Sequence, residues 1–519
     1  MKSEFRYGSA LIAVVLIFLH LSIYGGTFSI TEPEIDTLIY DLNEYINTNH
    51  NLVFITNSGA MGRDYNRLFG RQSGWYYPFN GDTLIIQYGG DTGTIMYDAG
   101  LVLCGKVNGS IRTAMAIRDV PEFVPGPLDR DTTFPDLSFF EVMKIDTLST
   151  TGDYDYDNWL IPYGAPVDLS GQPLLLGEQT LWTLFNDGDY SAHTNLTGGG
   201  TAPLGVEVHL TTYGSSLTGE ENMVYQNFKF YNRSDSTIDS FYISLFFDPD
   251  IGGPNDDLVG SDSVNNLFFA YNSYDYDNYY QFQIPAWGGK IITGPVIPSP
   301  GDTALFDGQT MPDFKNIGLT SVVGLTAASE PVTPEEIFLS ASGFDCKTGQ
   351  PLINPISGET TKFYASGNPV RRSDWVDTIE ADKKLMISFG PLTFNPGDSQ
   401  QVSLKIGAYI DNDRLLSLSY LRHILEPTIP IDSSIDSSDY QPIDSVQLLI
   451  SDFGLHEARF EPAKERWLTG YDWGGRHFFG GVDYAFNLFG SAIDTVKNPD
   501  SFHSIQIRFS NIERQYGYR

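Results

Sequence analysis

The stretch MVYQNFKFYNRSDSTIDSFYISLFFDPDIGGPNDDLVGSD, residues Met223–Asp262, decides the fold of this chain. Two runs of alternating apolar and polar residues, Val224–Tyr231 and Phe241–Phe247, flank a turn rich in Asn, Ser and Asp. This pattern predicts two strands joined as a β-hairpin or as the corner of a sandwich. The second run ends in an acidic loop that contains Gly252 and Gly253, and this loop holds the most distinctive chemistry of the sequence.

The composition around this stretch also favours strands over helices. Of the 519 residues, 51 are Gly and 29 are Pro, and Tyr and Phe contribute 30 and 34 more. Aromatic residues favour strands, whereas Gly and Pro favour the turns between them. We therefore predict a mainly β protein, with several β-sandwich-like domains in tandem and two short amphipathic helices.

The chain is too long for one ordinary domain, so several units are expected. Changes in composition suggest the following division: a signal peptide at 1–26, an N-terminal helix plus a small β domain at 27–135, a central β-sandwich region at 136–425, a linker rich in Ser, Asp and Pro at 426–445, and a C-terminal β unit, expected to be incomplete, at 446–519.

The first 26 residues are typical of a targeting segment. Lys2 and Arg6 precede the apolar run Ala10–Ile23, which is short for a membrane span and suits the hydrophobic region of a signal peptide. We expect an exported protein, secreted or at the cell surface. An uncleaved N-terminal anchor is the alternative, and no later stretch is long and apolar enough to span a bilayer.

Local patterns predict three further elements. Apolar residues at helical spacing indicate a helix at about 33–47 and a second one at about 413–424. The pair Asn108–Gly109 lies between two strand-like runs and predicts a tight hairpin.

Charge and cysteine content exclude some classes of function. The formal net charge of −34 and the lack of clustered Lys and Arg argue against binding to nucleic acid. The two cysteines, Cys104 and Cys346, are too few for a disulfide framework. The motifs of common hydrolases, phosphate-binding loops and zinc sites are missing, so we expect a binding or structural protein more than an enzyme.

The acidic loops predict metal binding. Calcium takes six to eight oxygen ligands, and closely spaced Asp residues on a loop with Gly can supply several of them. The predicted ligands are Asp248, Asp250, Asp256, Asp257 and Asp262, with a second, weaker group at Asp153, Asp155 and Asp157. The alternative is that these side chains only form turns by bonding to nearby backbone groups.

Aromatic residues suggest a second class of function. Trp75, Tyr76, Tyr77 and Trp287 could form a flat surface on which sugars stack, as in a carbohydrate-binding module. The competing interpretation is that they are core residues or cross-strand pairs. Exposure or burial of their rings separates the two.

A series of ordered motifs resembles a known family. The motifs are DYDNWLIPYGAPVDLSGQPLLLGEQTLWTLFNDGD (Asp155–Asp189), FFDPDIGGPNDDLVGSD (Phe246–Asp262), NIGLTSV (Asn316–Val322), ETTKFYASGNPV (Glu359–Val370), SDWVD (Ser373–Asp377) and GPLTFNPGDSQQV (Gly390–Val402). They are similar to an uncharacterised family of large exported proteins of Gram-negative bacteria, many of which end in a type IX secretion sorting domain. We expect this chain to lack that domain. The resemblance covers about residues 90–425 and implies export and a β-rich architecture, but no catalytic residues.

Together these patterns predict an exported structural or adhesive protein stabilised by calcium. A carbohydrate-binding module array, associated with capture or degradation of polysaccharide, is the alternative. The expected partner is an extracellular polymer or a surface component.

Overall fold

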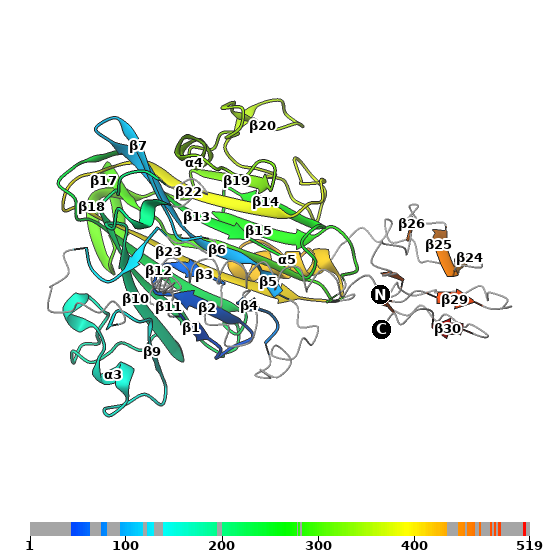
Figure 1. The fold of residues 1–519 in the computed structure, drawn as a ribbon, viewed down its shortest axis with the longest axis horizontal. Helices are drawn as coiled ribbons and strands as arrows, with labels where there is room; N and C mark the ends of the chain where they lie inside the picture. Colours follow the sequence, from blue (N-terminus) through cyan, green and yellow to red (C-terminus); the bar gives the residue numbers. More distant parts are fainter. Residues whose placement is uncertain are drawn as a thin grey trace, which may run out of the picture. The chain divides into compact units, whose positions relative to one another are not determined.

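The computed structural model describes residues 43–62, 74–79, 94–117, 122–128, 139–194, 200–277, 279–280 and 283–432, and the backbone of several short strands between 445 and 514. This part of the chain is mainly β, which confirms the predicted fold class. Two large antiparallel sheets form most of it (Figure 1).

Each of the two sheets is built from several separate segments of the chain. The ten-stranded sheet contains β1 (Asn43–Ile46), β2 (Leu52–Thr56), β3 (Ala60–Met61), β4 (Trp75–Tyr76), β5 (Thr94–Met96), β6 (Asp98–Val107), β7 (Ser110–Met115), β13 (Ile238–Asp248), β19 (Ser321–Thr326) and β22 (Lys383–Phe394). The nine-stranded sheet contains β8 (Val124–Pro125), β9 (Met143–Asp146), β10 (Gln179–Asn186), β11 (Val206–Gly214), β12 (Met223–Asn232), β14 (Asp257–Asp262), β15 (Leu267–Asn272), β16 (Pro285–Thr293) and β23 (Ser399–Ile410).

One large hydrophobic core joins side chains from both sheets. Phe247 of the first sheet stacks on Phe268 of the second with ring centroids 5.2 Å apart, and Trp75 meets Trp287 edge to face at 6.1 Å. Contacts of this kind between two inner faces are those of a β-sandwich.

The stretch Met223–Asp262 contains a corner of this sandwich. β12 pairs with β11 and β23 in one sheet, whereas β13 pairs with β6 and β22 in the other. The chain therefore crosses from sheet to sheet at residues 233–237 and does not form a hairpin. In β12 every second side chain is buried, but from Phe241 to Asp248 every residue of β13 is buried, because both faces of this central strand are covered.

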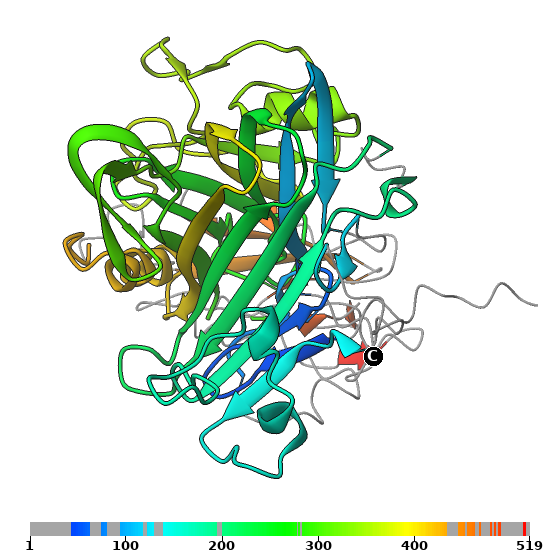
Figure 2. The ribbon, with the colours of Figure 1, turned by 90° about the vertical axis from the view of Figure 1, so that its left-hand side faces the viewer.

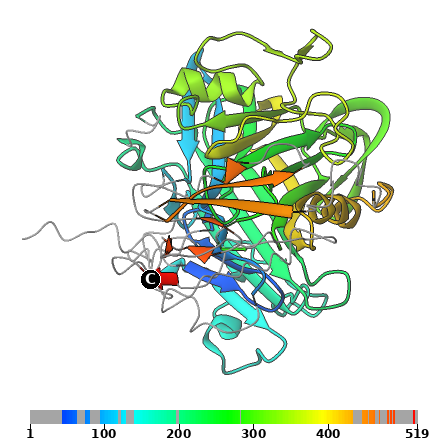
Figure 3. The same ribbon diagram turned by 90° about the vertical axis from the view of Figure 1, so that its right-hand side faces the viewer.

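Two helices cover the outer faces of the sandwich, one on each side (Figures 2 and 3). α4 (Pro334–Ala341) packs on outward side chains of the ten-stranded sheet, among them Val102 and Val323. α5 (Arg414–Leu425) packs its leucines against the nine-stranded sheet at Phe269. A third helix, α3 (Tyr154–Asp157), is a single turn in the connection from β9 to β10.

Two of the predicted local elements are present in the structure, and one differs from its prediction. The helix expected at 413–424 is confirmed by α5, and the Asn108–Gly109 turn joins β6 to β7 with positive φ at both residues. The helix expected at 33–47 is wrong at its end, because Asn43–Ile46 is strand β1, paired with β2. The rest of that segment lies outside the described residues.

The boundary predicted at residue 135 does not separate two folding units. β6 and β7 come from the range 27–135, yet β6 pairs along its length with β13 from the range 136–425. Both ranges also contribute to the same core. The physical reason is that a sheet joins strands irrespective of their distance along the chain.

Smaller elements complete the described structure. They are the hairpins β17 (Val296–Phe306) with β18 (Gln309–Asn316) and β20 (Leu352–Ile353) with β21 (Thr360–Thr361), and the backbone strands β24 (Ser445–Ser451), β25 (Gly454–Glu461), β26 (Trp467–Leu468), β27 (Phe478–Phe479), β28 (Val482–Asp483), β29 (Phe486–Leu488) and β30 (Ile512–Arg514). The predicted signal peptide at 1–26 and most of the linker at 426–445 lie outside the described residues.

Candidate metal centre

Three loops meet at one end of the sandwich and bring acidic residues together. They are residues 249–256 after β13, residues 273–277 after β15, and residues 374–382 before β22. The N–H of Ser273 donates to the carbonyl of Asp256 at 2.7 Å, which ties the first loop to the second. A β-bridge between Asp257 and Ala381 ties the start of β14 to the third loop.

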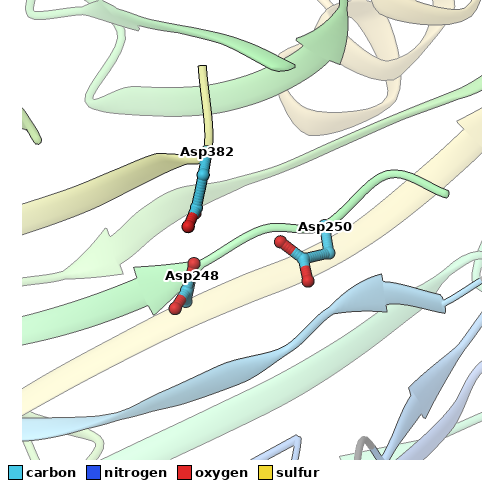
Figure 4. A group of neighbouring side chains, drawn as sticks. All are labelled: Asp248, Asp250 and Asp382. Carbon is cyan, nitrogen blue, oxygen red and sulfur yellow. The ribbon is translucent and has the colours of Figure 1, made fainter. Parts of the chain in front are cut away.

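The carboxylates of Asp248, Asp250 and Asp382 face one another across a common space (Figure 4). One oxygen from each lies within 4.8 Å of one oxygen from each of the others. Asp248 ends a buried strand, and its side chain is only 4% exposed, whereas the side chain of Asp382 is 40% exposed. The group is therefore buried on one side and open to solvent on the other.

A lysine ammonium already lies beside two of these carboxylates. The Nζ of Lys384 is 3.2 Å from Asp248 Oδ1 and 2.5 Å from Asp382 Oδ1. The two carboxylates raise the pKa of Lys384 against the opposing effect of burial. Lys384 balances one of the three negative charges, so the group keeps an excess of two.

The loop carboxylates resist ionisation. Burial, together with repulsion from Asp248 and Asp382, raises the pKa of Asp250 to about 7. Burial and the nearby Asp277 raise the pKa of Asp256 to about 7 as well. At neutral pH these groups therefore need a proton or a cation to offset their charge.

Asp257 gives independent support for a positively charged partner. Its side chain is fully buried, and Oδ1 has no hydrogen-bond partner among the described residues. Oδ2 accepts only a long bond, 3.4 Å, from the N–H of Ile251. Burial and repulsion from Asp256 and Asp250 raise the pKa of Asp257 well above its usual range. A buried carboxylate oxygen without a partner is costly, and a bound cation would remove that cost.

The predicted ligand set is thus only partly assembled. Asp248 and Asp250 meet, and Asp256 and Asp257 lie beside them. Asp262 belongs elsewhere, because its carboxylate bonds to Arg422 at 3.0 Å and to the side chain of Asn265. Asp382 was missed by sequence reasoning, since it lies far along the chain and only the pairing of β13 with β22 brings it close.

In the second predicted calcium group, Asp153 and Asp157 form turns, and Asp155 ties its helix to strand β9. Each carboxylate accepts a separate backbone N–H: Asp153 from Thr150 at 2.7 Å, Asp155 from Lys144 at 2.8 Å, and Asp157 from Gly152 at 3.0 Å. Side chains bound in this way do not converge on an ion. We therefore drop the calcium prediction for these three residues.

The predicted aromatic platform is wrong. Trp75, Tyr76, Tyr77 and Trp287 are each at most 2% exposed. Their side chains belong to hydrophobic clusters of the protein interior, and the Tyr77 hydroxyl donates to Asn222 Oδ1 at 2.8 Å. These rings are core residues because the second sheet and neighbouring loops cover them. The pattern of residues along a strand does not reveal this covering.

Comparisons with known proteins give no identification. No family model and no curated protein matches the chain, so the family resemblance drawn from its motifs stays a prediction. Solved structures with some likeness include a protein described as "Putative kojibiose phosphorylase from human microbiome", at 10% identity, and an amine oxidase from Aspergillus nidulans, at 9%. The match to the phosphorylase has a TM-score of 0.24 and covers 78% of this chain and 40% of that protein. The match to the amine oxidase has a TM-score of 0.25 and covers 82% of this chain and 55% of that protein. Likeness at this level carries no argument about function.

Within the described residues, helices that combine the length and the apolar character needed to cross a bilayer do not occur.

Proposed function

We propose that this chain is an exported structural or adhesive protein, secreted or held at the cell surface, whose sandwich is stabilised by calcium. The observation that carries the proposal is the convergence of Asp248, Asp250 and Asp382 from two separate strand ends, beside the unpartnered carboxylate oxygen of Asp257. Export rests on the targeting pattern of residues 1–26 and on the family resemblance.

The geometry favours calcium over magnesium. Calcium binds oxygen at about 2.3–2.6 Å, so ligands on opposite sides of the ion lie nearly 5 Å apart, whereas magnesium requires about 2.0–2.1 Å and a stricter geometry. The oxygens of the group lie within 4.8 Å of one another. Two of the three carboxylates, those of Asp250 and Asp382, lie on loops, and the irregular coordination of calcium suits ligands placed in this way.

Calcium at this position would join the two sheets. Asp248 belongs to β13 and Asp382 directly precedes β22, both in the ten-stranded sheet. The loop with Asp250 runs from β13 into β14 of the nine-stranded sheet. An ion held there would fix the loop that connects the two sheets. Such an ion would stabilise a protein exposed outside the cell.

The test is thermal unfolding in calcium and in chelator. We expect calcium to raise the melting temperature of the wild type, because binding to the native state alone adds about 2.7 kcal/mol at a hundredfold excess over Kd. Asp250→Asn should lose this response. Asp235→Asn, at an exposed position near the opposite end of β13, is the matched control and should keep it.

An equal melting temperature in calcium and chelator would show that the acidic loops only form turns. Export is tested separately, by fractionating cells that express the protein and sequencing the N-terminus of the recovered protein. Intact protein confined to the cytoplasm contradicts that part of the proposal.

A further inference from the structure

The proposed calcium position has a side that the protein does not close. Three carboxylates supply between three and six oxygens, and calcium takes six to eight. Asp382, on the open side, keeps 40% of its side chain exposed, whereas Asp248 on the inner side is buried. The remaining coordination positions therefore face solvent, where water or the oxygens of a ligand can occupy them.

Segments bonded to the acidic loops carry exposed apolar and aromatic side chains. Tyr274 and Tyr279 are 45% and 43% exposed, and Ile379 is 69% exposed. Tyr274 and Ile379 lie on two of the loops that form the acidic group, and Tyr279 lies two residues beyond Asp277. Ser273 precedes Tyr274 and Glu380 follows Ile379 in the sequence. The Ser273 hydroxyl donates to Glu380 Oε2 at 3.3 Å, so the loops that carry Tyr274 and Ile379 are in direct contact.

Tyr279 is held to the same group by its backbone. Its N–H donates to Asp277 Oδ1 at 2.7 Å, and the other oxygen of that carboxylate accepts the N–H of Gly253 at 2.9 Å. Gly253 lies in the loop of Asp250. The segment after β15, which carries both tyrosines, is thus hydrogen-bonded directly to the loop that contains Asp250.

Charge decides which class of ligand fits. The three carboxylates, the Lys384 ammonium and one divalent cation sum to zero, so the loaded site offers little net attraction to an anion. The formal net charge of −34 further repels acidic polymers. A neutral ligand with several hydroxyl groups meets no such repulsion, since hydroxyl oxygens can replace water on calcium.

We propose that this opening binds a neutral carbohydrate, with adjacent hydroxyls on the calcium ion and a sugar face against Tyr274 or Tyr279. The inference rests on the calcium site of the proposed function. It differs from the aromatic platform expected from the sequence, because these tyrosines are exposed and the earlier four rings are buried. Amphipathic rings suit the mixed polar and apolar faces of a sugar.

The test uses the full-length exported protein and gels that contain mannan, galactan or dextran as neutral polymers, with alginate as the anionic comparison. Migration is measured in calcium and in chelator. We expect at least one neutral polymer to retard the wild type at least severalfold in calcium only, and alginate to have no effect. The double variant Tyr274→Ala with Tyr279→Ala should lose retardation but keep the rise in melting temperature with calcium.

Two outcomes overturn the inference and leave the calcium site standing. One is a calcium-dependent melting temperature without retardation by any of the three neutral polymers. The other is retardation that persists in chelator or in the double tyrosine variant. If the wild type shows no calcium response in melting, the proposed calcium site fails, and the carbohydrate inference falls with it. Tyr190→Ala, at an exposed tyrosine outside these loops, is the control for loss of a surface ring.

Discussion

At the scale of single residues, the acidic group combines carboxylates that are unfavourable in isolation. Asp250 and Asp256 are largely buried near other carboxylates, and Asp257 is fully buried. Proteins keep such arrangements where a proton or a metal ion offsets the charge. The stability of this protein should therefore depend on both pH and calcium.

The pH dependence has a defined sign. The pKa values of Asp250 and Asp256 are about 7 in the folded protein and near 4 when unfolded, so between these values the folded state binds more protons. Stability from these groups is present below about pH 4 and is lost as the pH rises through about 7. We expect metal-stripped protein to melt several degrees lower at pH 8 than at pH 5, as followed by calorimetry.

The same calorimetry on a variant and with metal checks the assignment. Asp250→Asn should reduce the pH dependence, because the amide does not titrate, and the remainder should come from Asp256. Saturating calcium should flatten it as well, since the ion replaces the protons. A metal-free protein that becomes steadily more stable from pH 5 to pH 8 would contradict the raised pKa values.

At the scale of elements, the loop between β13 and β14 depends on a close approach of backbone to carboxylate. Gly252 has φ of +75°, and a Cβ at this position would lie 2.1 Å from Asp277 Oδ1. Gly301 has φ of +90° in the hairpin β17–β18, with nothing within 4 Å of its Cβ position. The two glycines share the left-handed backbone and differ in their surroundings.

This difference predicts the outcome of two matched substitutions. Gly252→Ala should weaken calcium binding by at least tenfold and lower the melting temperature, because Asp277 and the loop must move. Gly301→Ala should lower the free energy of unfolding by about 1 kcal/mol, from backbone strain alone, and leave calcium affinity unchanged. Titration calorimetry with calcium distinguishes them, and equal affinities for both variants would remove the role given to this loop.

The cap of α5 is a second element on which the sandwich depends. The Asp413 carboxylate accepts the N–H groups of Leu415 and Leu416 at 2.7 and 3.1 Å. Asp413→Ala should lower the free energy of unfolding by about 1 kcal/mol, whereas Asp413→Asn keeps an acceptor oxygen and should cost less. Chemical denaturation measures both. Equal stability of the alanine variant and the wild type would show that these bonds contribute nothing.

At the scale of the whole molecule, both sheets share one core, so they should unfold together. Trp287 has no exposed surface and contacts Phe247 and Trp75 of the facing sheet. We expect Trp287→Ala to lower the free energy of unfolding by about 3–5 kcal/mol. It should also lower the melting temperature of both sheets equally. Hydrogen exchange resolved by peptide measures this, with Tyr190→Ala as the exposed control. Independent melting of segments 98–115, from the ten-stranded sheet, and 206–232, from the nine-stranded sheet, would show separate domains.

The sequence by itself determined the fold class and several local features. The alternation in β12, the turn at Asn108–Gly109 and the cap of α5 were readable because each depends on neighbours within a few residues. The helix α4 carries a local signal too, because the sequence Thr-Pro-Glu-Glu at 333–336 is a capping motif in which the Thr333 hydroxyl accepts the N–H of Glu336.

Tertiary structure alone decided the rest. Asn43–Ile46 is a strand because β2 offers it a partner, although its apolar spacing suits a helix. Trp75 and Trp287 are buried because two sheets meet over them. Asp382 joins Asp248 because β22 lies beside β13. Each outcome depends on contacts between residues far apart in the chain, and these contacts leave no periodic trace in the sequence.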